Sequence, residues 1–320
     1  MNILSAGFVC GDLVLAPVDA LPPAGGNRFV QQATLTIGGC AANAAVAFAR
    51  LTTPTGGRSA LAGCIGADPL GHLLQAALAE AGVDTRPLQP TATATAINTA
   101  LVTSHGERSF YVFPGANDLL TPERLPDSLL RHFDHLHLGA VGALTGLAGP
   151  AGAEVARRAQ ALGLTVSLDI TLNPPRDTAA DVLPLLPHLD FFLPNRAEAQ
   201  AVLGPGDVDT LLSRGLAAGA RLMAVKLGEQ GCALATAAER LTAPALPVQA
   251  VDTVGAGDAW SAALVYAVRS GWPLTEAARF ANAAGARCTL FSGATAGLGD
   301  ATQIKQVLAS VDLLPAGRRG

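Results

Sequence analysis

Short hydrophobic runs alternate with longer Ala- and Leu-rich amphipathic segments along most of the chain. The short runs predict β-strands at 3–9, 61–65, 136–138, 164–168, 191–193 and 222–227. The amphipathic segments predict helices at 41–51, 70–81, 151–162 and 208–218, and several of these segments are followed by a glycine. Strand and helix in alternation favour an α/β fold, in which a doubly wound, mostly parallel sheet is flanked by helices on both faces.

Two segments interrupt this alternation. Residues 29–37 and 95–112 look like consecutive strands without a helix between them. We interpret them as a small accessory sheet, a β lid with strands contributed by about 12–37 and 93–115. In the stretch 90–97, which overlaps the start of the second segment, Thr alternates with Ala, and this predicts a pleated strand with one hydroxyl face and one apolar face. No internal repeat or linker divides the chain.

Composition narrows the possible functions. Half of the residues are hydrophobic, so a single large α/β domain over residues 1–320 is favoured. The formal charge of −4 and the scattered basic residues argue against nucleic acid or an anionic membrane as a partner. No signal peptide and no spanning segment is recognisable, so a cytoplasmic protein is expected. The five cysteines are far apart, which favours reduced thiols over a disulfide framework or a zinc site.

The most informative chemical motif is a glycine turn that precedes a long apolar segment. Gly255, Ala256 and Gly257 lead into this segment, and the free N–H groups of such a turn form a positive cup for an anion such as phosphate. Asp258 falls in the first helical turn, where its carboxylate can accept a proton from a hydroxyl that attacks a bound phosphorus atom. The alternative is that Asp258 only complements the helix dipole and the glycines only end a strand.

Two further turns carry candidate ligands. Gly38 and Gly39 precede a helix with Asn43 one turn inside, so a diol can approach the backbone and bind the amide, although such turns are also common without a ligand. Asn195 and Glu198 follow a buried strand, at a spacing that is also that of a helix capping box. Walker-type and dinucleotide-binding glycine motifs are missing from the sequence, which disfavours P-loop NTPases and classical oxidoreductases.

Together these motifs resemble the two signatures of the ribokinase family, also called the phosphofructokinase-B type. The run from Gly38 to Asn43 stands early and the run from Asp252 to Asp258 stands late, and this order makes the pair more specific than either part. Further segments that resemble the family lie at 7–12, 63–71, 195–198, 226–231 and 281–283. The resemblance covers nearly the whole chain. It implies a ribokinase-like fold with a β lid over the sugar, and possible homodimers that pair through the lid.

The resemblance implies an ATP-dependent kinase that transfers the γ-phosphoryl group to a hydroxymethyl group of a small sugar, with Asp258 as the base. Implied contacts are Asp12, Gly39 and Asn43 with the sugar, Gly255, Ala256 and Gly257 in the anion hole, and Asn195, Glu198, Lys226, Gly228 and Asn282 on the ATP side. Glu198 is implied to act on Mg²⁺ through water. Asp252 and backbone carbonyls near Val254 and Gly293 resemble the family's potassium (K⁺) site.

The acceptor of the phosphoryl group stays open. Cys40 stands where ribose-specific members often carry a lysine, and the stretch 169–173 departs from the Asp-x-Asn-x-Arg pattern of many sugar kinases. Fructose-type, deoxyribose-type and nucleoside substrates, the last as for an adenosine or pseudouridine kinase, are all compatible with the motifs. An alternative of another class is a sugar-binding regulator without turnover, which the retention of Asp258 disfavours.

Overall fold

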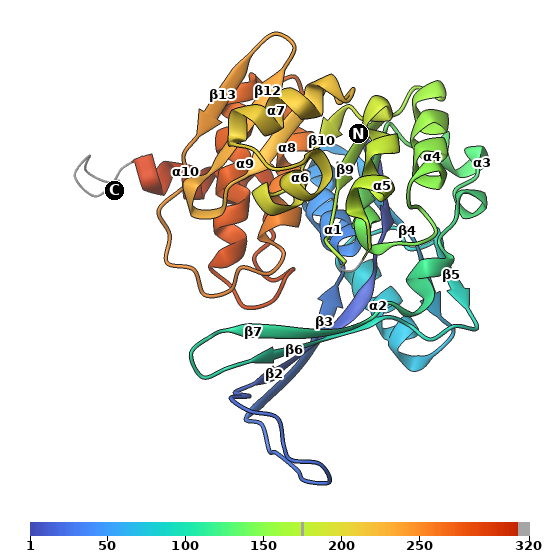
Figure 1. The fold of residues 1–320 in the computed structure, drawn as a ribbon, viewed down its shortest axis with the longest axis vertical. Helices are drawn as coiled ribbons and strands as arrows, with labels where there is room; N and C mark the ends of the chain where they lie inside the picture. Colours follow the sequence, from blue (N-terminus) through green and yellow to red (C-terminus); the bar gives the residue numbers. More distant parts are fainter. Residues whose placement is uncertain (174–175, 313–320) are drawn as a thin grey trace.

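The computed structural model describes residues 1–173 and 176–312, and a central sheet runs through the body of the molecule (Figure 1). Nine strands form this sheet in the order β13-β12-β11-β10-β9-β8-β1-β4-β5. All neighbours from β11 to β5 are parallel, and β12 and β13 are added antiparallel at one edge. The strands are β1 (Asn2–Gly7), β4 (Arg58–Gly66), β5 (Leu88–Thr91), β8 (His135–Gly139), β9 (Thr165–Asp169), β10 (Phe191–Phe192), β11 (Leu222–Lys226), β12 (Cys232–Thr236) and β13 (Arg240–Ala243).

Helices cover both faces of this sheet, because alternate residues of each buried strand point to opposite sides. Ile3 and Phe191 pack into one hydrophobic cluster, while their neighbours Leu4 and Phe192 pack into the other. The first cluster includes residues of α1 (Cys40–Thr52), α2 (Pro69–Glu80), α8 (Ala256–Arg269), α9 (Leu274–Thr289) and α10 (Ala301–Asp312). The second includes residues of α3 (Asp127–Leu130), α4 (Pro150–Ala161), α5 (Thr178–Val182), α6 (Arg196–Leu203) and α7 (Val208–Ala217).

The predicted doubly wound, mostly parallel fold is therefore confirmed, and so are most of its predicted elements. The helices predicted at 41–51, 70–81, 151–162 and 208–218 correspond to α1, α2, α4 and α7. The antiparallel hairpin of β12 and β13 was not predicted, because both strands are short and follow β11 after a brief turn rather than after a helix.

One local prediction is wrong. The Thr-Ala alternation over 90–97 does not form a continuous strand, since β5 ends at Thr91 and the next strand begins at Ile97. Thr95 explains the irregular path between them. Its Oγ1 donates to Asp68 Oδ1 at 2.7 Å and accepts from the Gly66 N–H at 2.8 Å, and its own N–H donates to Asp68 Oδ2 at 2.8 Å. These side-chain contacts replace a strand ladder for this segment.

A second sheet of four strands extends away from the body (Figure 1). We call it the small sheet; its order is β3-β2-β6-β7, with β2 (Cys10–Ala16), β3 (Gln32–Gly38), β6 (Ile97–Val102) and β7 (Arg108–Phe113). The segment predicted at 29–37 becomes strand only from Gln32, and the segment predicted at 95–112 divides into the hairpin of β6 and β7. β2 begins three residues after the end of β1, so this short connection joins the two sheets.

Among the described residues, no helix combines the length and the apolar character that crossing a bilayer requires. All five cysteines are free thiols, of which Cys40 is half-buried and the other four are buried.

Candidate active site

The turn from Gly255 to Gly257 forms the N-terminus of α8, as its glycines predict. Gly255 has a left-handed backbone (φ 79°), and a Cβ on it would lie 2.4 Å from the Ala294 carbonyl oxygen, so only glycine fits. A Cβ on Gly257 would lie 3.4 Å from Lys226 Nζ, so the lysine ammonium group faces this turn. The Ala256 N–H donates to the Thr253 carbonyl oxygen at 3.3 Å. The other N–H groups at a helix N-terminus lack intrahelical partners, and together with the ammonium group beside them they suit an anion.

Asp258 links this turn to the other glycine motif. It lies in the first turn of α8, is 9% exposed, and accepts a hydrogen bond on Oδ2 from Asn43 Nδ2 at 2.8 Å. Asn43 is buried in α1, 215 residues away in sequence, so packing of α1 against α8 creates the contact. Burial, and after it the charge of Asp169, raises the pKa of Asp258 to about 7. A carboxyl group with such a pKa is a base that is half-ionised near neutral pH.

Lys226 holds the centre of a buried charge cluster at the carboxyl ends of β9 and β11. Its Nζ donates to both carboxylate oxygens of Asp169, at 2.8 and 2.7 Å, and Asp169 Oδ2 also accepts from Ser261 Oγ at 2.7 Å. Burial lowers the pKa of Lys226, but the charges of Asp169 and Glu198 outweigh it and raise the pKa above its usual value. The lysine therefore carries a full positive charge beside the Gly257 turn.

Asp169 and Ser261 were not predicted as site residues. Asp169 is the first charged residue after the strand predicted at 164–168, and a polar residue at the carboxyl end of a parallel strand was the available signal. Ser261 lies one turn after Asp258 within an apolar helix, so its hydroxyl had no distinguishing pattern in the sequence.

Asn195 and Glu198 form the capping box that their spacing indicated. The Asn195 N–H donates to Glu198 Oε2 at 2.7 Å, and the Glu198 N–H donates to Asn195 Oδ1 at 3.0 Å, at the start of α6. Burial raises the pKa of Glu198 to about 7, although Lys226 opposes the shift. The cap thus also positions a carboxyl group next to the lysine. Gly228 opens a short turn after β11, and a Cβ at its position would meet open space.

Asn282, predicted near the adenosine half of ATP, uses both ends of its amide inside the protein. Its Oδ1 accepts from Trp260 Nε1 at 2.8 Å, and its Nδ2 donates to the carbonyl oxygens of Ala243 and Pro244 at 3.0 and 2.9 Å. These contacts tie α9 to α8 and to the segment that follows β13. These hydrogen bonds give Asn282 a structural role.

Asp12 lies on the small sheet beside the second glycine motif. Its Oδ1 accepts from Asn98 Nδ2 at 3.0 Å and from the Cys10 thiol at 3.3 Å, and burial raises the pKa of the carboxyl group. A Cβ on Gly38 would lie 2.1 Å from the Asp12 carboxyl carbon, so this glycine leaves the space that the carboxylate fills. Gly39, with φ 95°, caps α1 and approaches the Phe8 carbonyl oxygen. Asn98 was not predicted.

A cavity of about 30 Å³ lies between the small sheet and the body, lined by Asp12 and Asn98 together with Arg108, Asp252, Val254 and Gly293. Its lining brings the predicted sugar ligand Asp12 near the segment that leads into the anion turn. The small sheet contacts the body here, since Arg108 of β7 reaches Asp252.

Asp252, for which the resemblance implied a monovalent cation, is paired with an arginine in this structure. Its Oδ1 accepts from Arg108 Nη1 at 2.6 Å and from the Val254 N–H at 2.9 Å, and its Oδ2 accepts from the Gly293 N–H at 2.9 Å. Burial alone would raise the pKa of Asp252, but Arg108 and the two amides hold it below its usual value. An arginine thus already balances the charge that the potassium ion was expected to balance.

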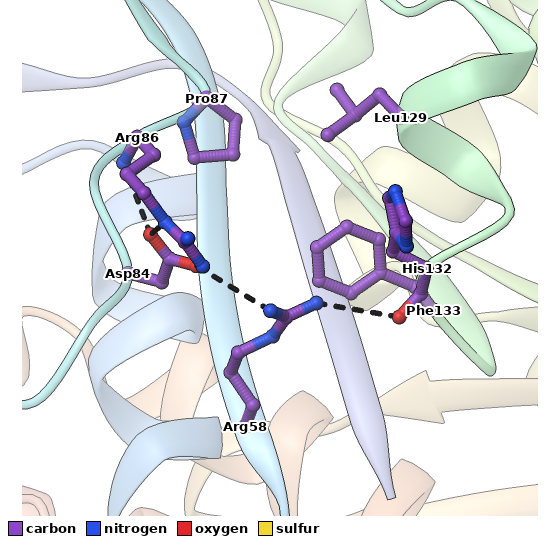
Figure 2. Close-up of a pocket in the computed structure, with 7 residues that line it drawn as sticks. All are labelled: Arg58, Asp84, Arg86, Pro87, Leu129, His132 and Phe133. Carbon is purple, nitrogen blue, oxygen red and sulfur yellow. Dashed lines mark hydrogen bonds and ion pairs between the residues drawn. The ribbon is translucent and has the colours of Figure 1, made fainter.

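A larger cavity, of about 310 Å³, lies elsewhere, at the amino ends of β4 and β8 (Figure 2). Two of its polar residues, Arg58 and Arg86, hold its walls together by pairing with Asp84. Arg86 donates to both oxygens of Asp84, at 2.9 and 2.6 Å, and Arg58 stacks over Phe133 with its guanidinium carbon 4.8 Å from the ring centroid (Figure 2). Ligands of open α/β sheets bind at the carboxyl ends of the strands. We therefore place the candidate active site at the carboxyl ends of β9 and β11, beside Asp258.

Comparisons with known proteins identify the family of the chain. A family model described as pfkB family carbohydrate kinase matches residues 2–300. The chain is 33% identical over 288 residues to an ATP-dependent ribose-1-phosphate kinase of Halopiger xanaduensis, a match that covers 89% of this chain and 91% of that protein. It is 34% identical over 275 residues to Fructokinase-2 of Oryza sativa subsp. japonica, which covers 80% of each.

The fold leads to the same group of proteins. A ribokinase structure from Thermotoga maritima superimposes with a TM-score of 0.83 at 25% identity, covering 97% of this chain and 99% of that one. The predicted ribokinase-like fold and the predicted family are thereby confirmed. With a family match over almost its whole length and a glycine turn that brings Asp258 to the mouth of a helix, the chain belongs to the pfkB family of carbohydrate kinases.

Proposed function

We propose that this protein transfers the γ-phosphoryl group of ATP to a hydroxymethyl group of a small sugar. The observation that carries the proposal is the place of Asp258, which is buried in the first turn of α8, bonded to Asn43, and next to the anion turn that Lys226 faces. A base, an anion-binding turn and a cation in one place are what phosphoryl transfer to an alcohol requires. The relatives named above are themselves kinases.

Two unsatisfied acceptors support a polyol as the substrate. Asn43 Oδ1 and Asn98 Oδ1 are buried and have no hydrogen-bond partner among the described residues, which is rare in a folded protein. In each amide the Nδ2 group is already bound: that of Asn43 donates to Asp258, and that of Asn98 donates to Asp12. Sugar hydroxyls are donors of the right kind to satisfy them. In this arrangement Asn43 binds the substrate and holds the base at the same time.

The catalytic steps follow from these positions. Asp258 accepts the proton of the attacking hydroxyl, while the N–H groups of the Gly255–Gly257 turn and the ammonium group of Lys226 stabilise the negative charge of the phosphoryl group in transit. Glu198, held by its capping box beside Lys226, suits the water shell of a magnesium ion. When bound with ATP, magnesium neutralises phosphate charge. Asp169 and Ser261 keep Lys226 in place.

A nucleoside is the second candidate acceptor. Phe110 of β7 lines the cavity beside Asp12, and an aromatic face there offers a stacking surface to a base. A phosphorylated pentose is a third acceptor to include, because it is what the Halopiger relative is named for.

The proposal is tested by incubating the protein and MgATP with a mixed pool of sugars, sugar monophosphates and nucleosides, and by mass spectrometry of the products. We expect one class of neutral sugar to gain a single phosphoryl group with matching loss of ATP. A protein that binds a sugar in calorimetry and phosphorylates none of the pool would instead be a regulator without turnover. Phosphorylation confined to nucleosides would select the second candidate.

Turnover is also expected to fall as the pH decreases through about 7. Asp258 must be ionised to accept a proton, and burial raises its pKa to about 7. Burial raises the pKa of Glu198 to about 7 as well, so the profile reports the titration of both carboxyl groups. The measurement is kcat/KM for the sugar between about pH 5 and about pH 9. A flat profile down to the acid end, with the protein still folded by circular dichroism, would contradict the assignment of the base.

A further inference from the structure

Arg108 connects the small sheet to the segment that leads into the anion turn. It is the first residue of β7, and its Nη1 lies 2.6 Å from Asp252 Oδ1, across 144 positions of sequence. The pair is largely removed from water, since the Arg108 side chain is 24% exposed and that of Asp252 is 8% exposed. Attraction between charges is stronger in such a place than at an open surface. The attraction between Arg108 and Asp252 is therefore stronger than that of an exposed surface ion pair.

Asp252 in turn organises the residues around it. Its two oxygens accept from the N–H groups of Val254 and Gly293, which belong to two separate loops. The Cys288 thiol lies between the same loops, 3.6 Å from the carbonyl oxygens of Val254 and Ala294. The next residue after Val254 is Gly255, whose backbone packs against Ala294. The conformation of the anion turn thus depends on a correctly oriented, charge-balanced Asp252.

Arg108 already balances the negative charge of Asp252, so a monovalent cation is not needed to neutralise it. One carboxylate faces one guanidinium group, and both carboxylate oxygens already accept protein hydrogen bonds. A cation added beside Asp252 would lie within a few ångströms of the Arg108 guanidinium group, and like charges at that distance repel.

We propose that Arg108 is the built-in counter-ion of Asp252, so that the anion turn is ordered without a monovalent cation and only while the small sheet lies against the body. Arg108 is a positioning residue, because it acts on the turn through Asp252. It shares the small sheet with Asp12 and Asn98. A movement of this sheet onto a sugar would therefore bring the sugar ligands and the counter-ion into place together.

The test compares the wild type with Arg108→Ala in KCl and in tetramethylammonium chloride at equal ionic strength, because the second cation is too large to enter a site of this kind. The melting temperature of the ligand-free protein is read first, and turnover with MgATP and the accepted sugar second. The wild type is expected to behave alike in both salts. Arg108→Ala is expected to melt lower and to turn over up to about a hundredfold more slowly in tetramethylammonium, as displaced catalytic groups do, and to recover in KCl.

Three further variants separate this role from a general loss of structure. Arg108→Lys keeps a positive charge and is expected to stay indifferent to the salt. Arg108→Ala combined with Asp252→Asn removes both charges, so it is expected to gain nothing from KCl even if it is less stable. Arg28→Ala is the matched control, since Arg28 is an exposed arginine in the connection between β2 and β3.

Wild-type protein that melts higher or turns over faster in KCl than in tetramethylammonium would overturn the proposal, as would an Arg108→Ala variant that shows no preference between the salts. The rate measurement relies on the proposed kinase function, but the melting measurement does not. A protein that phosphorylates nothing in the pool while Arg108→Ala still recovers its melting temperature in KCl would refute the function and leave the counter-ion intact.

Discussion

Replacing Asp258 with asparagine is expected to lower kcat by about 10²- to 10⁴-fold, the usual contribution of a general base. The carboxamide keeps the shape of the carboxylate, and its oxygen can still accept the hydrogen bond from Asn43 Nδ2. Binding of the sugar and of ATP should therefore change little. The loss should be confined to the chemical step, because the amide cannot take the proton of the attacking hydroxyl. Single-turnover kinetics and calorimetry of the two ligands measure the two parts separately.

The matched control for this variant is Asp209→Asn. Asp209 also lies in the first turn of a helix, α7, but it is exposed on the surface, so its loss removes a similar interaction with a helix dipole and no chemistry. Wild-type turnover in Asp258→Asn would refute the base assignment. A parallel loss of sugar binding and of turnover would show that Asp258 acts mainly by holding Asn43 and the substrate.

Replacing Lys226 with methionine is expected to have the largest effect on stability. The lysine is the cation that faces Asp169, and their side chains are 13% and 4% exposed. Removing one partner of a buried pair leaves the other charge without compensation, which costs about 3–5 kcal/mol in the free energy of unfolding. Asp258 and Glu198 lose a stabilising charge as well, so their pKa values should rise further and turnover near pH 7 should fall. Urea unfolding and the pH profile of kcat/KM measure these effects.

Lys305→Met provides the comparison, because it makes the same change at an exposed position. Lys305 lies over the ring of Trp272, with Nζ 4.9 Å from the ring centroid, and losing such a contact costs about 0.5–1 kcal/mol. Equal losses of stability in the two variants would mean that the Lys226 cluster is solvated and contributes nothing special. A stable Lys226→Met variant with full turnover would remove Lys226 from the path of the phosphoryl group.

Asn195 makes contacts that a local motif predicts, whereas Asp252 makes a contact that no local motif predicts. Asn195 and Glu198 are three residues apart, and their spacing correctly predicted a capping box, because a cap depends only on the backbone of one turn. The expected surroundings of Asp252 depended on residues far away in sequence. Nothing near Asp252 in the chain indicates that Arg108 would reach it, since a lone arginine at the start of a strand carries no such signal.

The same distinction separates the correct from the incorrect local predictions. The periodicity of α1, α2, α4 and α7 is repeated over several turns, so the hydrophobic pattern determined these helices. The Thr-Ala run at 90–97 had an equally regular pattern and still failed as a strand, because Asp68 binds the hydroxyl and the N–H of Thr95. A segment with alternating polar and apolar residues forms a strand only where a neighbouring strand is available to pair with it.

Residues close together in the chain account for most of the alternation of strands and helices, for the glycine turns at Gly39 and Gly255, and for the presence of Asp258 at the start of a helix. Which groups surround Asp258 and Asp252 depends on the packing of distant segments. The contacts of Asn43 with Asp258 and of Arg108 with Asp252 span 215 and 144 positions, and the packing of α1 on α8 and of the small sheet on the body creates them. Hydrophobic burial, which drives this packing, has no direction and leaves no local motif for the polar contacts that it brings together.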